Sequence, residues 1–255
     1  MTAFTDNELS CNGFLGGRVQ LLQPHKGYRA GVDPVLLAAA VPAAPGHAVL
    51  ELGCGAGQAL LCLGGRVPGL SLAGVELQLP YADLARRNAA ANDQKLEVFE
   101  ADLSSLPGEL KQRHFQHVIA NPPYYKRGAH SQSEDAGRRR ALGEETPLAD
   151  WIAVAARRLA PKGYLHMIQR ADRLPDMLAG CSGSLGSLEI LPLCPRAGRA
   201  AELVILRARK GGKADFRLHA PLVLHEGHQH ERDGDSYQPK IRAVLRDAAA
   251  LPWPQ

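Results

Sequence analysis

The sequence predicts an α/β fold: a mostly parallel sheet of seven strands with helices on both faces and an antiparallel hairpin at its C-terminal end. Three observations predict it. From residue 46 onward, short apolar runs alternate with longer stretches of helical pattern, as in doubly wound sheets. A glycine-rich segment joins the first apolar run to the first helical stretch. The last two apolar runs are too close together for a helix to connect them.

Each element of the core follows from this alternation, which indicates strands at 48–52, 70–77, 96–102, 115–121, 163–169, 188–195 and 202–210 and helices near 57–65, 79–92, 144–160 and 171–180. Six residues, RAGRAA, separate the last two strands, so these two should pair antiparallel. We expect one domain over residues 1–255, made of a core at 46–210, an N-terminal segment at 1–45 and a C-terminal extension at 211–255.

Composition excludes several classes of protein. The hydrophobic fraction of 45% is ordinary for a globular chain, and a formal charge of +4 favours a polyanionic partner only weakly. The five cysteines are scattered without a CxxC pair, which argues against a disulfide framework and against a zinc site. The chain begins without a secretory leader and lacks a run of about eighteen apolar residues, so we expect a cytoplasmic protein outside the membrane.

The glycine-rich segment predicts a small-molecule site. It follows the strand at 48–52 and contains Glu51, Gly53, Cys54, Gly55 and Gly57. Glycines at this place permit a tight turn and a close approach of backbone to ligand. The spacing is GxGxG, whereas the dinucleotide fingerprint is GxGxxG, so a pyrophosphate ligand is disfavoured. A strand-to-helix turn without a ligand is the alternative.

Two later acids strengthen the prediction. Glu76 ends the second strand, where a carboxylate can accept from ribose hydroxyls, and Asp102 ends the third, where it can accept from an adenine amino group. Leu77 and Leu103 follow these acids and are assigned to the same ligand site. Acidic residues at three consecutive strand ends favour a positively charged ligand. Either acid alone would more often be a solvated strand end.

A second motif, NPPY, follows the strand at 115–121. Its two prolines end the strand and fix an extended turn at the carboxyl edge of the sheet. The Asn121 side-chain oxygen and the Pro122 carbonyl can accept the two hydrogens of an exocyclic amine, while Pro123 and the Tyr124 ring contact its flat plane. Such an arrangement would draw the amine lone pair out of conjugation. A simple strand-ending turn is the alternative.

These residues resemble class I amino-methyltransferases, and more narrowly the family that methylates adenine N6 in the anticodon loop of valine tRNA. The resemblance rests on FLGGRVQLLQPHKGYRAGVDPVLLAAAVP, LELGCGAG, IANPPY, PLCPRAGRAAELVILRARKG and PLVLHEG. It implies a Rossmann-like class I methyltransferase fold, S-adenosylmethionine as cofactor and tRNA as partner. It also implies that the N-terminal segment covers the cofactor, with Tyr28, Arg29 and Asp33 at the methionine end and Asp33 near its amino group.

Asp33 has a second interpretation, because Asp followed by Pro34 is an ordinary helix N-terminus and the two roles can coexist. Basic residues beside the acceptor motif and in the last hairpin are candidates for RNA phosphates, although solvated surface charge explains each one equally well. They are Lys126, Arg127, Arg138, Arg139, Arg140, Arg196, Arg199 and Lys210.

The histidines do not predict a metal site. His219, His225, His228 and His230 lie in a polar segment without a companion cysteine or an HExxH pattern. His166 lies within a predicted buried strand and is interpreted as a hydrogen-bonded core residue.

Several rival functions share parts of this pattern. Protein-glutamine N5-methyltransferases also carry NPPY, and the short stretch before the first strand, without a separate helical domain, disfavours them here. Ribosomal RNA guanine N2-methyltransferases remain open within the class. Outside it, the rivals are a non-catalytic RNA-binding module with a Rossmann-like shell and a nicotinamide oxidoreductase.

Overall fold

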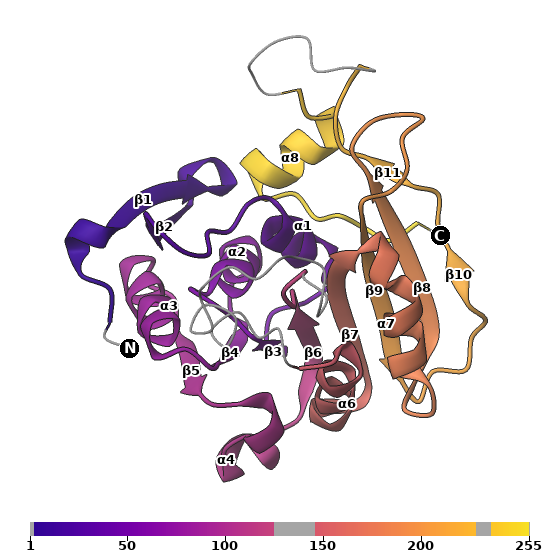
Figure 1. Cartoon of the computed structure of the whole chain (residues 1–255), viewed down its shortest axis with the longest axis horizontal. Helices are drawn as coiled ribbons and strands as arrows, with labels where there is room; N and C mark the ends of the chain where they lie inside the picture. The colour runs from indigo at the N-terminus through magenta and orange to yellow at the C-terminus, as the bar shows by residue number, and fades with distance from the viewer. Residues whose placement is uncertain (1–2, 125–145, 228–235, 255) are drawn as a thin grey trace, which may run out of the picture.

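Nine strands form the central sheet of the computed structural model, which describes residues 3–124, 146–227 and 236–254 (Figure 1). Seven of them run across the sheet in the order β5, β4, β3, β6, β7, β9, β8. Their bounds are β3 (Ala48–Leu52), β4 (Ser71–Glu76), β5 (Leu96–Glu100), β6 (Phe115–Ala120), β7 (Leu159–Arg170), β8 (Leu185–Cys194) and β9 (Leu203–Lys210). The predicted seven-stranded core is therefore confirmed.

The predicted hairpin is also confirmed. β9 pairs antiparallel with both β7 and β8, whereas β3 to β7 pair parallel with one another. The sheet extends further than we predicted, because β10 (Arg217–Leu218) and β11 (Leu222–Val223) pair parallel with the outer edge of β8. Strands of two residues carry no detectable alternation in the sequence, which is why they were missed.

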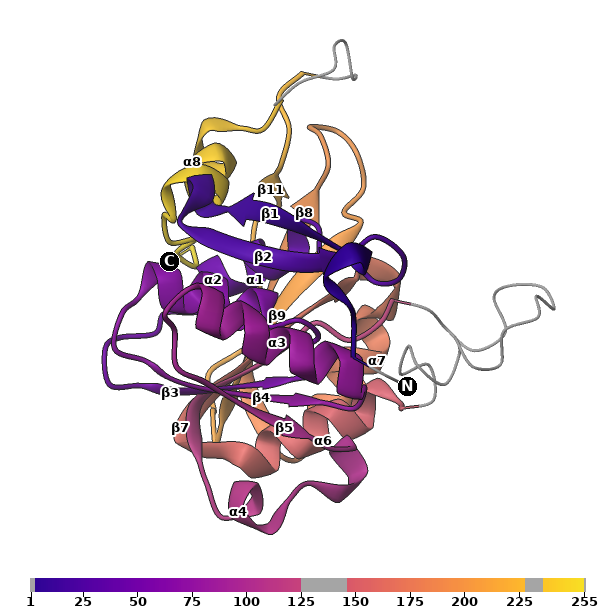
Figure 2. The ribbon, with the colours of Figure 1, turned by 90° about the vertical axis from the view of Figure 1, so that its left-hand side faces the viewer.

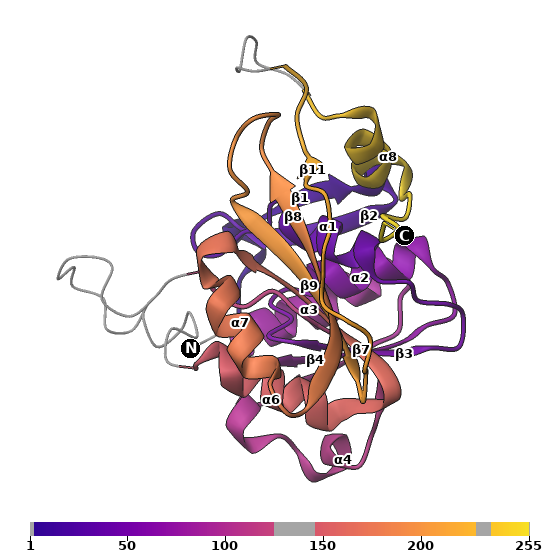
Figure 3. The ribbon, with the colours of Figure 1, turned by 90° about the vertical axis from the view of Figure 1, so that its right-hand side faces the viewer.

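Helices cover both faces of the sheet (Figure 2). One face packs against α1 (Asp33–Ala40), α2 (Gln58–Arg66) and α3 (Leu79–Ala91), and α8 (Pro239–Asp247) packs on α1 in the same apolar cluster. The other packs against α4 (Gly108–Lys111), α6 (Leu148–Arg158) and α7 (Leu174–Cys181), and Figure 3 shows α7 beside β8 and β9. Ile119 belongs to the first apolar cluster, and its neighbours Val118 and Ala120 to the second, because successive side chains of a strand point to opposite faces.

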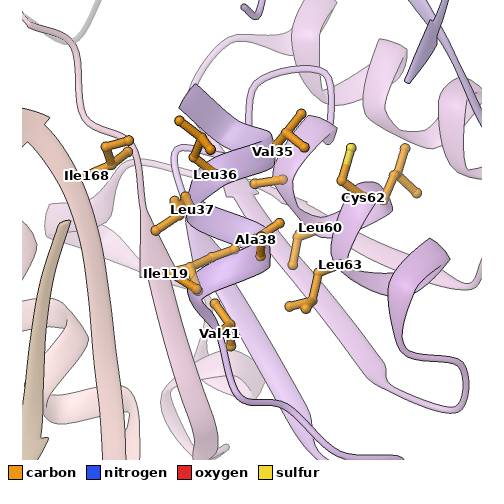
Figure 4. Packing of buried hydrophobic residues seen from close by; sticks show 14 of the residues in the cluster. Val35, Leu36, Leu37, Ala38, Val41, Leu60, Cys62, Leu63, Ile119 and Ile168 are labelled. Atoms are coloured by element: carbon orange, nitrogen blue, oxygen red, sulfur yellow. The ribbon is translucent and has the colours of Figure 1, made fainter. Parts of the chain in front are cut away.

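The helix α1 is buried along almost its whole length. Residues 34–40 are all buried, and Figure 4 shows Leu36 and Leu37 packed toward Ile119 of β6 and Ile168 of β7. An all-apolar helix is stable only when it is covered on every side. Burial of each large side chain contributes about 1.5–3 kcal/mol, so α1 is firmly anchored and fixes the position of Asp33 at its first turn.

The N-terminal segment forms its own two-stranded antiparallel sheet, β1 (Leu9–Phe14) and β2 (Val19–Pro24), which we did not predict. Asn88 of α3 and Asn92, the C-cap of α3, bond to it in place of a third strand. The Asn88 amide contacts the backbone N and O of Leu22 at 2.7 and 3.1 Å, and Asn92 does the same at Gln20 at 2.8 and 2.7 Å. These bonds attach the segment to the core beside α3 (Figure 2).

The C-terminal extension packs against α1. The backbone N–H of Leu251 and the indole N–H of Trp253 donate to the carbonyls of Ala39 and Ala40, each at 2.8 Å. These donors satisfy carbonyls at the C-terminal end of α1. Within the described ranges, no helix is long and apolar enough to cross a membrane.

Candidate functional site

A cavity of about 320 Å³ opens at the carboxyl edge of the sheet, where the strand order reverses between β3 and β6. Ligands of open α/β sheets bind at such reversal points. Leu52 of β3 pairs with Ala120 of β6 and with Val75 of β4. The residues that follow, Gly53, Asn121 and Glu76, therefore lie side by side, and all three line the cavity. The two predicted motifs meet in one site.

The glycine turn adopts backbone conformations that favour glycine. Gly53, Gly55 and Gly57 have φ of +64°, +54° and +87°, and Gly57 is the N-cap of α2. At Gly53 a Cβ atom would lie 2.6 Å from Cη2 of Trp151, so this position also lacks space for a side chain. Cys54, between Gly53 and Gly55 in the sequence, is buried and lines the cavity. Gly57 itself is not among the lining residues and acts through the turn.

Buried acids face this cavity. Burial raises the pKa of the Glu51 carboxyl well above its ordinary value, and the Glu76 charge raises it further. Glu51 Oε2 is buried without a hydrogen-bond partner among the described residues. A buried carboxylate oxygen normally has a partner, so the site is incomplete without a cationic or hydrogen-donating ligand.

Glu76 connects β4 to the glycine turn. Its carboxylate accepts from the backbone N–H of Gly55 and of Gln78, each at 2.9 Å. Burial raises the pKa of Glu76, and these N–H donors partly offset the rise. Asp33 and Asp102 also line the cavity. Arg29 is the only basic residue among the described lining residues. The Arg29 guanidinium donates to the Pro24 carbonyl, Ser10 Oγ and Asn12 Oδ1. Acidic residues outnumber it among the described lining residues, so the cavity is rich in acids.

The position of Asp102 corrects one prediction. β5 ends at Glu100, and Asp102 is the exposed N-cap of the short helix η3 (Leu103–Ser105), where its side chain accepts from Ser104 N–H at 2.7 Å. Asp favours N-cap positions over strand ends. Leu77 is 49% exposed and lines the cavity together with half-buried Leu103, so both present apolar surface to the cavity.

All four residues of the acceptor motif line the cavity, and two partners that the sequence did not reveal hold them. Tyr124 Oη donates to Asp33 Oδ2 at 2.6 Å, which joins the motif to α1. Burial and this carboxylate raise the pKa of Tyr124, so the phenol stays protonated. Gln169 of β7 donates to the carbonyls of Pro122 and Pro123 at 3.2 and 3.4 Å.

α1 begins at Asp33, as the interpretation of Asp33 and Pro34 as a helix N-terminus predicted, but the Asp33 side chain does not cap the helix. The N-cap is Val32, which makes no side-chain cap bond, and Asp33 is the first helical residue with its carboxylate turned toward Tyr124. Trp151, Gln58 and Tyr81 also line the cavity, and sequence reasoning missed them. Trp151 lies within the predicted helix at 144–160, and only its contact with Gly53 singles it out.

The basic candidates contribute little to the described part of the site. Lys126, Arg127 and Arg138 to Arg140 lie outside the described residues. Arg196 donates to the carbonyls of Glu226 and Gly227, and Lys210 Nζ donates to the Leu159 carbonyl at 2.7 Å. Neither these two nor exposed Arg199 lines the cavity. In the described part of the chain, no cluster of three or more His, Cys, Asp or Glu residues could hold a metal ion.

Comparison with known proteins identifies the family. The sequence pattern of the family described as methyltransferase small domain matches residues 30–185, which include the glycine turn, NPPY, Asp33 and Gln169. The chain belongs to this family. Among solved structures, this methyltransferase small domain protein is similar to a predicted O-methyltransferase from Agrobacterium tumefaciens, with 27% identity and a TM-score of 0.70, covering 88% of this chain and 100% of that one. The fold is the class I methyltransferase fold.

Curated relatives from several bacteria carry the name tRNA1(Val) (adenine(37)-N6)-methyltransferase. One, from Porphyromonas gingivalis strain W83, is 35% identical over 159 residues, which are 58% of this chain. The matched region spans 61% of that relative's length. Another, from Dickeya chrysanthemi, is 29% identical over 227 residues, covering 86% of this chain and 87% of the relative.

Proposed function

We propose that this chain transfers a methyl group from S-adenosylmethionine to an exocyclic amino nitrogen, and that the acceptor is adenine N6 in a tRNA. The observation that carries the proposal is that the glycine turn and NPPY line one acid-rich cavity at the reversal point of the sheet. The partnerless Glu51 oxygen and the acidic lining suit a cofactor with ammonium and sulfonium charges.

The proposed chemistry requires positioning more than acid or base strength. When bound, S-adenosylmethionine supplies an electrophilic methyl group on a sulfonium. Asn121 Oδ1 and the Pro122 carbonyl would accept the two amine hydrogens and direct the nitrogen lone pair away from the ring plane. Tyr124 would support that plane. The nitrogen–carbon bond forms as the carbon–sulfur bond breaks, and the proton leaves the cationic amine for solvent.

The names of the relatives support adenine in tRNA as the acceptor. The A. tumefaciens structure carries an O-methyltransferase name, and a hydroxyl acceptor offers one hydrogen where this site offers two acceptors, so we favour nitrogen. A protein glutamine and guanine N2 in ribosomal RNA also present an NH₂ group with two hydrogens. The test must therefore distinguish adenine from these two acceptors. The five free cysteines fit the reducing cytoplasm in which tRNA is modified.

The test offers the purified chain a tritiated methyl donor together with bulk tRNA, ribosomal RNA and total protein, and identifies the labelled residue by mass spectrometry. We expect N6-methyladenosine in tRNA. Label in protein glutamine, in ribosomal guanine or on a hydroxyl oxygen would refute the adenine assignment, and nicotinamide binding without methyl transfer would indicate an oxidoreductase.

A matched pair of variants tests the chemistry. Asn121→Ala should lower kcat by about 10²- to 10³-fold while S-adenosylhomocysteine still binds. Asn121→Asp keeps an accepting oxygen and should retain more activity than the alanine variant. Equal kcat for the wild type and Asn121→Ala would exclude the proposed acceptor site.

A further inference from the structure

Gln169 is a fully buried polar side chain next to the acceptor motif. It is the penultimate residue of β7, the strand beside β6, and its exposed fraction is 0%. A buried amide must find partners for both its oxygen and its nitrogen, or its burial costs stability. The partners of Gln169 therefore show which groups this side chain holds in place.

The hydrogen bonds fix the orientation of the Gln169 amide. Its Oε1 accepts from the backbone N–H of Arg170 at 2.9 Å, and its Nε2 donates to the carbonyls of Pro122 and Pro123. The opposite orientation would place an amide NH₂ against the Arg170 N–H and an oxygen against two carbonyl oxygens. Of the two donated bonds, that to Pro122 is shorter, at 3.2 Å against 3.4 Å.

These bonds reach backbone carbonyls that no longer take part in the hydrogen bonding of the sheet. β6 ends at Ala120, so the carbonyls of Pro122 and Pro123 lie beyond the strand pairing. A carbonyl oxygen has two lone pairs, and the bond from Gln169 uses one of those of Pro122. Among the described residues, Gln169 is the donor to this carbonyl, and Pro122 lines the cavity, so a ligand there could use the second lone pair.

We infer that Gln169 is a positioning residue for methyl transfer: it orients the Pro122 carbonyl so that its second lone pair accepts a hydrogen of the acceptor amine. The inference rests on the proposed function and extends it to a side chain on a neighbouring strand. Gln169 acts through Pro122 and not by touching the amine. A role in packing alone would require the volume of the side chain but not a hydrogen-bond donor.

Substitution by glutamate separates these two roles. Glutamate has nearly the same volume, and its protonated form can donate to the Pro122 carbonyl while its other oxygen accepts from Arg170 N–H. The ionised form would place negative charge against two carbonyl oxygens. Buried glutamates can have pKa values of about 8–9, so the switch between these forms falls within a practical assay range.

We therefore expect the ratio of kcat for Gln169→Glu to kcat for wild type to fall as pH rises from about 6 to about 9, since the donor is lost on ionisation. Gln169→Leu, which lacks the donor at every pH, should lower kcat by about 10- to 100-fold with a flat ratio. The wild type measured at each pH cancels the titration of other groups. S-adenosylhomocysteine binding by each variant verifies its fold.

Gln23→Glu is the matched control. Gln23 is also a buried glutamine, 3% exposed, whose Oε1 accepts from the backbone N–H of Ala30 at 2.9 Å and whose Nε2 donates to Asn12 Oδ1 at 3.2 Å. It makes the same kinds of bond without contacting the acceptor motif. Its kcat ratio to wild type should not change with pH.

The assay uses the mixture of tRNA, ribosomal RNA and protein, with kcat determined on whichever acceptor takes the label. The identity of the labelled residue tests the proposed function, and the pH dependence of the ratio tests Gln169, so the two can fail separately. A flat ratio for Gln169→Glu, or wild-type kcat for Gln169→Leu, would overturn the inference.

Discussion

At the residue scale, Gly53 combines two constraints that can be measured separately. Its φ is +64°, and an added Cβ would meet the Trp151 ring at 2.6 Å, whereas Gly183 has a φ of +81° with open space around it. Both alanine variants incur backbone strain, and only Gly53→Ala adds the steric clash. We expect Gly53→Ala to lower the free energy of unfolding by about 1–3 kcal/mol more than Gly183→Ala.

Urea denaturation of the two variants measures this difference. Repeating Gly53→Ala in a Trp151→Leu background should remove most of the excess, because the colliding ring atoms are gone. An equal loss in the two glycine variants would show that the clash is relieved by movement of Trp151.

Glu51 leads to a prediction about ligand charge. Burial raises its pKa, so the free protein carries a larger protonated fraction of Glu51 than an exposed glutamate would at the same pH. Only the carboxylate attracts a sulfonium, and its population grows as pH rises through that raised pKa. The affinity for S-adenosylmethionine relative to the neutral-sulfur product S-adenosylhomocysteine should therefore increase with pH.

Calorimetric titration with both ligands at a series of pH values tests the prediction. Glu51→Gln should weaken binding of S-adenosylmethionine by about tenfold more than binding of S-adenosylhomocysteine, equivalent to about 1.4 kcal/mol, and should remove the pH dependence of the ratio. Parallel changes for the two ligands would indicate that Glu51 does not sense the sulfur charge.

At the scale of elements, the bond between Asp33 and Tyr124 joins α1 to the turn after β6. α1 is anchored by burial, so it can hold the tyrosine ring in one orientation. Tyr124→Phe keeps the ring and removes the bond, and should lower kcat/KM by about tenfold, the value of a hydrogen bond to a charged group. Asp33→Ala should cost about the same, and the double variant little more than either single one. Single-turnover methylation rates of the wild type, the two single variants and the double variant measure this double-mutant cycle. Additive losses in the double variant would show that the two residues act independently.

The sequence predicted the elements with strong periodicity and missed those without it. Seven core strands, the hairpin and the helices on both faces follow from apolar runs and connection lengths. The sheet of β1 and β2 escaped prediction because its edge bonds to Asn88 of α3 and to Asn92, the C-cap of that helix, and such long-range contacts have no local signal. The same reason applies to Gln169 and to the bond between Asp33 and Tyr124: the motifs identified the cavity, but not the distant side chains that hold it.

At the scale of the whole molecule, three histidines, His47, His117 and His166, form a row across neighbouring strands near the amino edge of the sheet. His47 Nδ1 lies 3.2 Å from His117 Nε2, and His117 Nδ1 lies 3.4 Å from His166 Nε2. The buried His166 Nδ1 has no partner among the described residues, so the prediction of a hydrogen-bonded core histidine holds for one of its two ring nitrogens. Arg66 and Arg207 lie close enough to act on this row electrostatically. Burial, the neighbouring histidine and these arginines all oppose a further positive charge.

Burial, together with the positive neighbours, lowers the pKa of His117 from 6.5 to about 4 and that of His166 well below 6.5. The unfolded chain therefore takes up protons below pH 6.5 that the folded chain does not, so stability must fall between pH 6.5 and about 4. Each histidine contributes a slope of up to about 1.4 kcal/mol per pH unit. Urea midpoints across this range should fall less steeply for the His117→Asn and His166→Asn double variant than for wild type, and exposed His25→Asn serves as the control. A slope unchanged by the double variant would mean that carboxylates elsewhere, and not this histidine row, set the acid limit of the fold.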